Sequence, residues 1–584
     1  MRIEGKRIIA FTIEKDRERY VLHLADTENK TDGVCKKADI AVEPANIRRI
    51  ANLVSNDKYA YVGFGNRYRD NIMLNYILLN QSALESMGTK NVTEFIDNNL
   101  ERTLSGEDSE LERKYKYATL FNSFDLQRFM FSKDQMVTLE EFVVSSDFEH
   151  TGKEHDVDNI VNILELNKER IAARLEIENI YGEDLFDAHE GIVGNKLIKS
   201  LYAKKNGIKR SEIRNVSDGP KSVRIGDILL PCISFETEWL KMFLDELKDE
   251  TIDIGDNWTK YVAVGRYGAF MNLAGLRMNT EPCMLKSDCD GDIYNIDVAS
   301  FYPTILSAYS IRPRQVNGAF NDIFDDMLAQ RLRFKYNSNE ECSKAMKFML
   351  NGIVGQFMIE GSWLYDPAAS LKIRVNGALM MLMLMESLLD IADIKCVTID
   401  GMVVKTKDFD KMKEMLERWS VKTGLHADTK KYEYSYMLSN NDYVSDSTSK
   451  GFFSYSMNNG HASVPNIIRK AVIDNIINNV PVSETVTNGD NICDYLSSIT
   501  SNDTLEWYGS MFNNARFYYS GGQKLCKVKE NLSGEPTLVP VTDNGVTVVE
   551  NIENKMPDDI NFQYYMTEAG KIVEKMKFTQ LNLF

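Results

Sequence analysis

The sequence predicts a multidomain protein that combines α/β and α+β domains. Its 584 residues exceed what one hydrophobic core can organise, so several domains are expected. Residues 1 to about 190 have an α/β pattern, which opens with apolar runs at 7–14 and 20–24 separated by a turn. Further along, short apolar strands at 294–298 and 394–405 flank a pair of helices. No low-complexity tract or internal repeat interrupts this pattern.

The composition excludes several classes of protein. The start of the sequence lacks the apolar run of a secretory signal. The most apolar stretch, residues 378–385, ends at Glu386 and is too short to cross a bilayer, so we expect a buried core helix there. The eight cysteines include no C-x-x-C pair, which indicates neither a zinc site nor a disulfide framework. We therefore expect a cytoplasmic protein with reduced thiols and no membrane partner.

Charge is unevenly distributed along the chain. The net charge of −17 argues at first against a nucleic-acid partner, but phosphate binding needs only local positive charge. The segment 328–350 is locally positive by three, because its five basic residues outnumber its two acidic ones. The basic residues are Arg331, Arg333, Lys335, Lys344 and Lys347, and the acidic ones are Glu340 and Glu341.

Two aspartates stand at the ends of predicted strands. Residues 294–298 form a short strand that stops where Ser300 and Pro303 begin a turn into a helix, which leaves Asp297 at the strand end. The step Asp400-Gly401 divides two apolar runs and predicts a hairpin with the Asp400 carboxylate at its turn. Either aspartate alone is more simply a cap or a turn residue. Together they suit a magnesium site completed by substrate phosphate.

The basic segment is predicted to form two helices, 321–336 and 341–357, with Asn339 as the cap of the second. Arg331 and Lys335 are four residues apart and share a face of the first helix. On the second helix one stripe carries Lys344, Lys347, Asn351 and Gly355. Such a stripe can neutralise a triphosphate and then let a base pair approach the backbone. The alternative is a solvated helical hairpin whose charges serve only solubility.

These segments together resemble family B DNA polymerases, especially the compact enzymes of bacteriophages. The motif D-x-x-S-[LF]-Y-P is matched by residues 297–303, and K-x3-N-[SG]-x-x-G by residues 347–355, with Val354 where an aromatic is usual. The third motif, D-T-D-S or T-D-G, is matched by residues 398–401. Thr398 replaces the first aspartate there, so only Asp400 is left for the metal role.

The resemblance implies an RNase H-like exonuclease domain followed by a right-hand polymerase. The implied parts are an exonuclease-like domain (1–190), palm (191–320 and 358–440), fingers helix pair (321–357), thumb (441–577) and a clamp-binding tail (578–584). Asp297 and Asp400 are implied as catalytic residues, and with Val298 as ligands of two Mg²⁺ ions, or of Mn²⁺ in their place. Contacts to the incoming nucleotide are implied for Arg331, Lys335, Lys347 and Asn351, with Tyr302 as the gate against ribose. Contacts to DNA are implied for Gly352, Gly355, Tyr443 and Arg516.

The region after the palm and the spacing of the motifs refine this resemblance. Residues 441–443 stand where the family has K-x-Y, so the lysine that grips the primer is missing. Residues 516–519 fit either a thumb strand that faces DNA or an aromatic core strand. Only about fifty residues separate Asp297 from Lys347, and a similar number separate Lys347 from Asp400. The insertions of the protein-primed branch do not fit these intervals, so we expect extension of a nucleic-acid primer.

The amino-terminal domain resembles the 3′–5′ exonuclease domain of the family but lacks most of its carboxylates. The first motif, D-x-E, has Thr12 in place of aspartate and keeps Glu14. The second motif has Arg69 where aspartate belongs, followed by Asp70, and the third keeps Asp156 but has Gly152 for tyrosine. A guanidinium in the site opposes metal charge, so an inactive domain kept for structure is expected. The alternative uses Asp26 and Glu28 as the D-x-E pair, with Asp70 as the second ligand.

The last five residues, Gln580-Leu581-Asn582-Leu583-Phe584, resemble the Q-L-x-L-F peptide with which bacterial polymerases bind the ring-shaped sliding clamp. Leu583 and Phe584 would fill an apolar pocket while Gln580 fixes the orientation. The alternative is an apolar tail that folds onto the thumb.

The resulting expectation is a DNA-dependent DNA polymerase of phage or plasmid replication in a bacterial cytoplasm. Its partners would be primer-template DNA, deoxynucleoside triphosphates and the sliding clamp, with the chain acting as a monomeric catalytic subunit. Two rivals are kept. One is a catalytically inactive replisome or defence scaffold that retains the polymerase shape, and the other is a specialised, lesion-tolerant polymerase.

Overall fold

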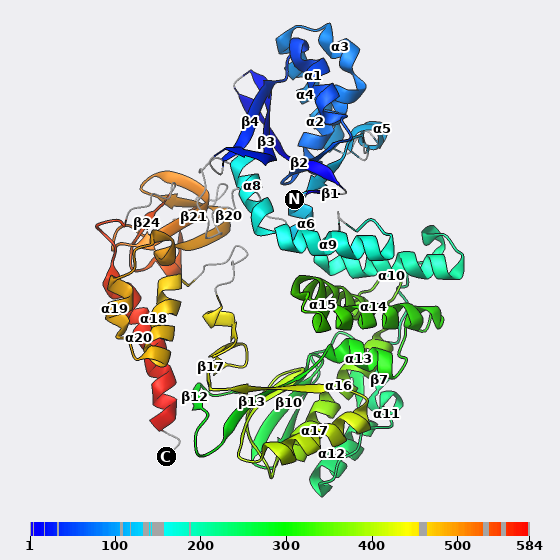
Figure 1. The fold of residues 1–584 in the computed structure, drawn as a ribbon, viewed down its shortest axis with the longest axis vertical. Coiled ribbons are helices and arrows are strands. Elements are labelled where there is room, and N and C mark those ends of the chain that lie inside the picture. The colour runs from blue at the N-terminus through cyan, green and yellow to red at the C-terminus, as the bar shows by residue number, and fades with distance from the viewer. Residues whose placement is uncertain are drawn as a thin grey trace. The chain divides into compact units, whose positions relative to one another are not determined.

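The computed structural model describes most of the chain as two compact units. The residues outside the description are 1, 4, 17, 32–33, 106–108, 117, 119, 132–138, 140–141, 143–156, 186–187, 279, 455–463, 529–536, 550–555 and 582–584. The first unit comprises Met1–Glu190, Met457–Ile467 and Asn488–Tyr564, and the second comprises Gly191–Ser456, Ile468–Thr487 and Tyr565–Phe584. Both units mix helices with sheets (Figure 1).

The first unit begins with a mixed sheet in the order β4-β3-β2-β5-β6, with β1 added at β2. β2 runs antiparallel to β3 and parallel to β5, and β5 runs parallel to β6. The central strands β2 and β5 carry consecutive buried residues, so both of their faces are apolar, as expected for a sheet covered on both sides. Their bounds are β1 Arg2–Ile3, β2 Lys6–Asp16, β3 Arg19–Thr31, β4 Val34–Ala41, β5 Tyr59–Gly63 and β6 Ser123–Asp125.

Helices cover both faces of this sheet, which gives the α/β layering that the sequence predicts. One core packs Phe11, Ile13 and Leu22 against helices α1 to α4, and the other packs Ile8, Ala10 and Val62 against α6, α8 and α9. The helices of the first face are α1 Pro44–Val54, α2 Asp70–Leu79, α3 Gln81–Glu85 and α4 Thr89–Leu104. Those of the second face are α6 Leu126–Met130, α8 Val157–Leu166 and α9 Lys168–Tyr181.

The second unit is built around a four-stranded antiparallel sheet in the order β14-β15-β13-β16. The strand predicted at 294–298 is β13, and the predicted hairpin is β14 with β15. Helix α13 follows β13 after Ser300, whose φ of 51° makes the sharp turn between strand and helix. The bounds are β13 Asp292–Val298, α13 Phe301–Ala308, β14 Asp393–Val397, β15 Gly401–Thr406, α17 Phe409–Thr423 and β16 Ala427–Tyr432.

Two further helical features of this unit match the sequence prediction. The helix pair is α14 (Ala319–Tyr336) and α15 (Glu340–Gly355), which lie side by side (Figure 1). Asn339 caps α15 by accepting a hydrogen bond from the backbone N–H of Cys342 at 3.2 Å. The apolar stretch lies in α16 (Pro367–Leu388), which has the length and hydropathy of a membrane span. Since 78% of its most apolar window is buried in the protein, α16 is a core helix.

Helix α10 (Glu190–Asn206) packs on α15 through glycine. A Cβ atom on Gly194 would lie 2.2 Å from the Met349 carbonyl oxygen, and one on Gly352 would lie 3.2 Å from the Gly191 carbonyl oxygen. The two helix backbones therefore touch directly, because no side chain separates them at these positions.

Smaller sheets complete the two units. In the second unit, β9 Thr259–Val264, β10 Tyr267–Asn272 and β11 Gly275–Met278 form a meander. A second sheet there has the order β12-β17-β18-β19, with β12 Cys283–Lys286, β17 Tyr434–Ser439, β18 Asp442–Ser445 and β19 Ser449–Lys450. The first unit contains the sheet β23-β22-β20-β21-β24, with β20 Ser497–Trp507, β21 Ser510–Tyr519, β22 Cys526–Val528, β23 Thr537–Leu538 and β24 Val546–Val548.

Candidate active site

The central sheet of the second unit brings the two predicted aspartates together. Asp297 lies directly opposite Gly401 in the β13–β15 register. The backbone N–H of the next residue, Val298, donates to the Asp400 carbonyl at 2.8 Å. Asp400 and Asp297 therefore occupy adjacent strands at the same end of one sheet. Residues about a hundred positions apart in sequence meet because β13 inserts between β15 and β16.

The turn that carries Asp400 differs in detail from the expected Asp-Gly hairpin. Ile399 and Asp400 are its central residues, since Thr398 N–H donates to the Gly401 carbonyl at 2.8 Å and the Thr398 hydroxyl donates to the same oxygen at 3.1 Å. Gly401 already belongs to β15. A Cβ atom on it would lie 2.5 Å from the Ile296 carbonyl oxygen, so glycine serves the close approach to β13.

The carboxylates of Asp297 and Asp400 form a like-charge pair. Burial raises the pKa of Asp297 above its ordinary value, and the Asp400 charge raises it further. Lys347 and Lys335 act in the opposite direction, because their positive charges favour the ionised carboxylate. The site thus sets two acidic groups against cations from α14 and α15.

Arg331 is the most buried of these cations. It is 7% exposed, and its Nε and Nη1 atoms have no hydrogen-bond acceptor among the described residues. Burial lowers the pKa of the guanidinium, while the charge of Asp297 raises it. A buried guanidinium with unused donors is costly unless an anion completes it.

The other predicted nucleotide contacts lie on the exposed side of the helix pair. Lys347 and Asn351 are exposed on α15. Lys335 on α14 forms an ion pair with Asp428 at 2.9 Å. Lys344, the outer member of the predicted stripe, pairs with Glu341 at 2.6 Å, so its charge is already balanced on its own helix.

Tyr302 is held rigidly at the start of α13. Its hydroxyl donates to the Ala274 carbonyl at 2.6 Å, and burial raises the pKa of the phenol. Gly275 and Gly377 make room for the ring, since a Cβ atom on either would lie about 3 Å from it (3.1 Å from Oη and 3.0 Å from Cε1). The ring is therefore fixed beside the turn that carries Asp400.

The donor set fits Mg²⁺. Two hard carboxylate oxygens on rigid strands, with mutual repulsion that a divalent cation relieves, are what this ion takes from a protein before water and phosphate complete its shell. Among the described residues no cluster of three or more His, Cys, Asp or Glu has metal-binding geometry. The chain alone would therefore hold the ion incompletely, as expected where a substrate supplies the remaining oxygens.

The structure contradicts one of the predicted DNA contacts. Arg516 on β21 is only 4% exposed between buried Ala515 and Phe517, so the aromatic core strand is the right alternative and the predicted DNA contact is wrong. Gly352 meets the Gly191 backbone of α10, so its close approach is to the protein itself. Gly355 has open space around its Cα. Tyr443 lies on β18, partly buried beside the core of the central sheet.

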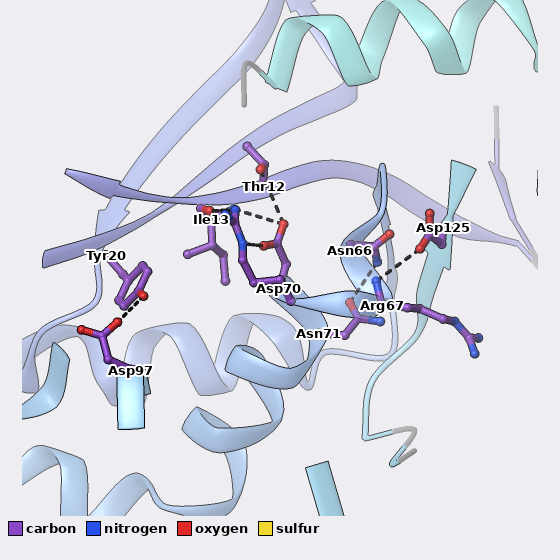
Figure 2. Close-up of polar contacts among 10 residues, drawn as sticks. Thr12, Ile13, Tyr20, Asn66, Arg67, Asp70, Asn71, Asp97 and Asp125 are labelled. Atoms are coloured by element: carbon purple, nitrogen blue, oxygen red, sulfur yellow. Dashed lines mark hydrogen bonds and ion pairs between the residues drawn. The ribbon is translucent and has the colours of Figure 1, made fainter. Parts of the chain in front are cut away.

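The carboxylate of Asp70 in the amino-terminal domain is hydrogen-bonded by neighbouring groups of the protein (Figure 2). Its Oδ2 atom accepts from the Thr12 hydroxyl at 3.5 Å and from the Ile13 N–H at 3.3 Å, and its Oδ1 atom accepts from Arg69 Nε at 3.0 Å. Arg69 also donates to the Ile13 carbonyl. The Arg69 guanidinium therefore neutralises the Asp70 carboxylate that follows it in the predicted second exonuclease motif.

The alternative pair of exonuclease carboxylates is not supported. Asp26 lies opposite Ile9 and Thr12 lies opposite His23, so the side chains of Asp26 and Thr12 project from opposite faces of the sheet. Asp26 is paired with Arg7 at 2.5 Å. Asp70 contacts the Thr12 hydroxyl and the Ile13 N–H, whereas Asp26 lies opposite Ile9, four residues earlier on β2. Glu14 is exposed at the end of β2, and Asp156 lies outside the described residues.

A buried carboxylate that the sequence did not single out organises the loop before α2. Asp125 at the end of β6 accepts backbone N–H groups from Gly65 at 2.9 Å and Gln127 at 3.0 Å. It also accepts the backbone N–H of Arg67 at 3.2 Å (Figure 2). Burial raises its pKa, and these hydrogen bonds partly offset that effect. Asp125 thus stabilises the loop, and no local sequence pattern predicts this role.

Sequence reasoning also missed two residues of the second unit. Asp428 on β16 lies opposite Asp297, and no motif marks it. Lys450 on β19 lies opposite Tyr443, where it supplies a lysine beside the tyrosine of the altered K-x-Y segment. Lys450 follows Tyr443 by seven residues, so the pairing of β18 with β19 was needed to bring the two together.

The predicted clamp-binding tail is described only in part. Gln580 and Leu581 form the end of helix α20 (Phe562–Leu581) without described side chains. Leu583 and Phe584 lie outside the described residues. The tail therefore stays a prediction.

Comparison with known proteins gives one kind of match. No protein-family model and no curated protein matches the sequence. Among solved structures, the chain is similar to the family B DNA polymerase from the hyperthermophilic archaeon Pyrobaculum calidifontis, with 11% sequence identity and a TM-score of 0.45. The match covers 98% of this chain and 78% of that chain.

Proposed function

We propose that the chain is a DNA-dependent DNA polymerase that extends a primer by two-metal phosphoryl transfer. The observation that carries the proposal is the pairing of Asp297 and Asp400 with the buried, incompletely bonded guanidinium of Arg331. Two carboxylates suit a divalent cation, and orphaned cationic donors suit a triphosphate. In this assignment the central sheet is the palm and α14 with α15 are the fingers.

Each group of the site has a role in this reaction. Asp297 and Asp400, with the main chain of Val298, would hold two Mg²⁺ ions, which when bound activate the primer 3′-hydroxyl and neutralise the leaving pyrophosphate. Arg331 and Lys347 bind the triphosphate and stabilise the charge that it gains during transfer. Tyr302, fixed by its bond to the Ala274 carbonyl, presents its ring beneath the sugar and excludes a ribose 2′-hydroxyl.

Lys335 is positioned to bind the same triphosphate. It pairs with Asp428 at 2.9 Å, and Asp428 lies opposite Asp297 in the sheet register. An arriving triphosphate competes for this lysine with a stronger, more concentrated negative charge. Asp428 is thereby a positioning residue that keeps Lys335 over the site.

We further propose that the chain lacks proofreading and acts in phage or plasmid replication. The Arg69–Asp70 ion pair supports the loss of exonuclease activity, because the guanidinium neutralises a carboxylate that a metal ion would need. The short intervals around Lys347 support a nucleic-acid primer, and the terminal Q-L-x-L-F-like peptide supports tethering to a bacterial sliding clamp. The chain would work as a monomeric catalytic subunit in the bacterial cytoplasm.

Primer extension tests the proposal. Purified wild type should extend a primed template in the presence of Mg²⁺ and deoxynucleoside triphosphates, and Asp400→Ala should lower the rate at least about a hundredfold. Asp326→Ala, which removes an exposed carboxylate from α14, is the matched control and should keep the rate of wild type. Failure of wild type to extend any primer would favour the inactive scaffold. Full activity of Asp400→Ala would contradict the assignment of Asp400 to the active site.

A further inference from the structure

The amino-terminal domain contains a cavity of about 820 Å³ that the proposed polymerase function does not use. It lies between the β2–β3–β4 part of the sheet and helix α1. Lys36, Ala38 and Ile40 alternate along β4 and so share one face, which lines this cavity. Asp26 lines it as well, so the cavity is on the sheet face opposite to Thr12, and neither Thr12 nor Asp70 belongs to its lining. It is therefore separate from the exonuclease-like carboxylates.

The floor of the cavity is apolar. Ile9, Leu24 and Ile40 contribute it from three neighbouring strands, and all three are buried in the core beneath. Leu53 from α1 and the ring of Tyr59 from β5 complete it. Asn29 and Asn52 add amide groups that both donate and accept hydrogen bonds. Concave apolar sites of this size with a few polar groups are typical of small-ligand sites.

The rim of the cavity is basic in a strongly acidic protein. Its lining contains five cations and one carboxylate, Asp26, although the whole chain carries a net charge of −17. Three of the cations pair with acids: Arg7 with Asp26, Lys37 with Asp158 and Arg48 with Glu85. The other two, Lys36 and Arg49, are exposed, and no described carboxylate lies within ion-pair distance of either. Positive charge is thus left over where the cavity opens.

We propose that this cavity binds a nucleotide unit, with the base on the floor beside Tyr59 and a phosphate between Lys36 and Arg49. The aromatic ring and branched side chains suit a planar base, the amides of Asn29 and Asn52 suit its polar edge, and the two unpaired cations suit phosphate. A flexible acidic peptide would use the cations but not the deep apolar floor. The nucleotide is either free or part of single-stranded DNA, since both present the same chemistry.

Photo-crosslinking to the full-length protein tests the proposal and distinguishes the two sources. One probe is 4-thiothymidine monophosphate, and the other is an oligothymidylate with a single central 4-thiothymidine. We expect the adduct to map to the peptides that contain Asn29, Asn52 or Tyr59, with the monophosphate if a free nucleotide is bound and only with the oligonucleotide if single-stranded DNA is bound. Asp400→Ala should give the same adduct, because the cavity does not depend on the polymerase site.

Two variants and one control make the result decisive. Lys36→Glu combined with Arg49→Glu should weaken probe capture by at least about tenfold, since it replaces attraction for phosphate by repulsion. Ala38→Trp should do the same by filling the cavity from an exposed position on β4. Lys90→Glu makes one such charge reversal on α4, outside the lining, and should leave capture unchanged. All these side chains are exposed, so thermal unfolding should match wild type.

The proposal is overturned by any of three results. Adducts could be absent from the peptides of the cavity, or they could form equally in wild type and in the charge-reversed variant. Alternatively, polyglutamate could displace the probe at concentrations at which thymidine monophosphate and inorganic phosphate do not, which would assign the cavity to an acidic peptide.

Discussion

Arg331 shows how a single buried side chain can be unfavourable for the free protein and useful for the substrate. The guanidinium is 7% exposed, and two of its nitrogens have no acceptor among the described residues. Desolvation of these donors costs free energy in the absence of a ligand. The same donors need no further desolvation when a triphosphate arrives, so the cost appears in stability and the benefit in nucleotide binding.

Arg331→Met should therefore separate stability from activity. The free energy of unfolding should rise by about 1–3 kcal/mol, because an incompletely bonded buried charge is replaced by a side chain of similar volume. The efficiency of deoxynucleotide incorporation should fall roughly ten- to a hundredfold, as a charge-assisted contact is lost. Urea unfolding and steady-state extension measure the two effects. Arg333→Met, on the exposed side of α14, is the control, and equal effects of both variants would contradict the role of Arg331.

Asp125 gives a prediction about stability and pH. Its carboxylate accepts N–H groups on both oxygens, so Asp125→Asn leaves the Arg67 N–H facing another donor and should cost about 1–3 kcal/mol. The pKa of Asp125 in the folded protein is raised above the ordinary 3.8, so folding takes up a proton between these two values. The stability of wild type relative to Asp125→Asn should thus fall as pH rises from 3.8 through the folded-state pKa. Urea titrations over this range check the sign, and a constant difference would show that the pKa is not raised.

At the scale of elements, the site depends on how closely β13 and β15 approach. Gly401 permits the contact with the Ile296 carbonyl, and the turn before it carries Asp400. The hairpin and the helix pair were predictable, because apolar alternation, an Asp-Gly step and the Asn339 cap are local signals. The register that places Asp428 opposite Asp297 was not, since it depends on which strands become neighbours.

Gly401→Ala should disable catalysis by moving the Asp400 turn. A methyl group 2.5 Å from the Ile296 oxygen must push the strands apart, and a displacement of about 1 Å at a catalytic group can cost about a hundredfold in rate. Gly570→Ala is the control in open space, where alanine should stabilise helix α20 by roughly 0.5–1 kcal/mol. Primer extension and thermal unfolding of both variants test this, and unchanged extension by Gly401→Ala would refute the argument. Slower extension by a stable Gly355→Ala would support the predicted approach of DNA to Gly355.

At the scale of the whole molecule, sequence patterns predicted the mixed α/β domains but not which side chains each core would enclose. Arg516 illustrates the limit. Arg516 precedes three aromatic residues in its strand, a pattern that suits either a DNA-facing surface or a core. The packing of β21 between β20 and β24 buries the side chain and shows that it belongs to the core. Asp26 and Asp70 illustrate it again. Each has a motif-like neighbourhood, but strand register puts Asp26 on the sheet face opposite to Thr12, which contacts Asp70.

The carboxyl-terminal peptide predicts a property of the whole protein in a replication complex. Removal of residues 580–584 should abolish stimulation by a bacterial sliding clamp, because Leu583 and Phe584 would each contribute about 1.5–3 kcal/mol of apolar burial. Extension without the clamp should be unchanged. Phe584→Ala and Thr579→Ala, compared in a processivity assay with and without clamp, give a matched pair. Retention of clamp stimulation after the deletion would show that the tail is not the ligand.

The glycine contacts between α10 and α15 have a mechanical consequence. With the Met349 carbonyl lying where a Cβ of Gly194 would be, neither helix can slide or rotate independently of the other. If the helix pair α14–α15 swings toward a bound triphosphate, α10 must swing with it as one rigid lever.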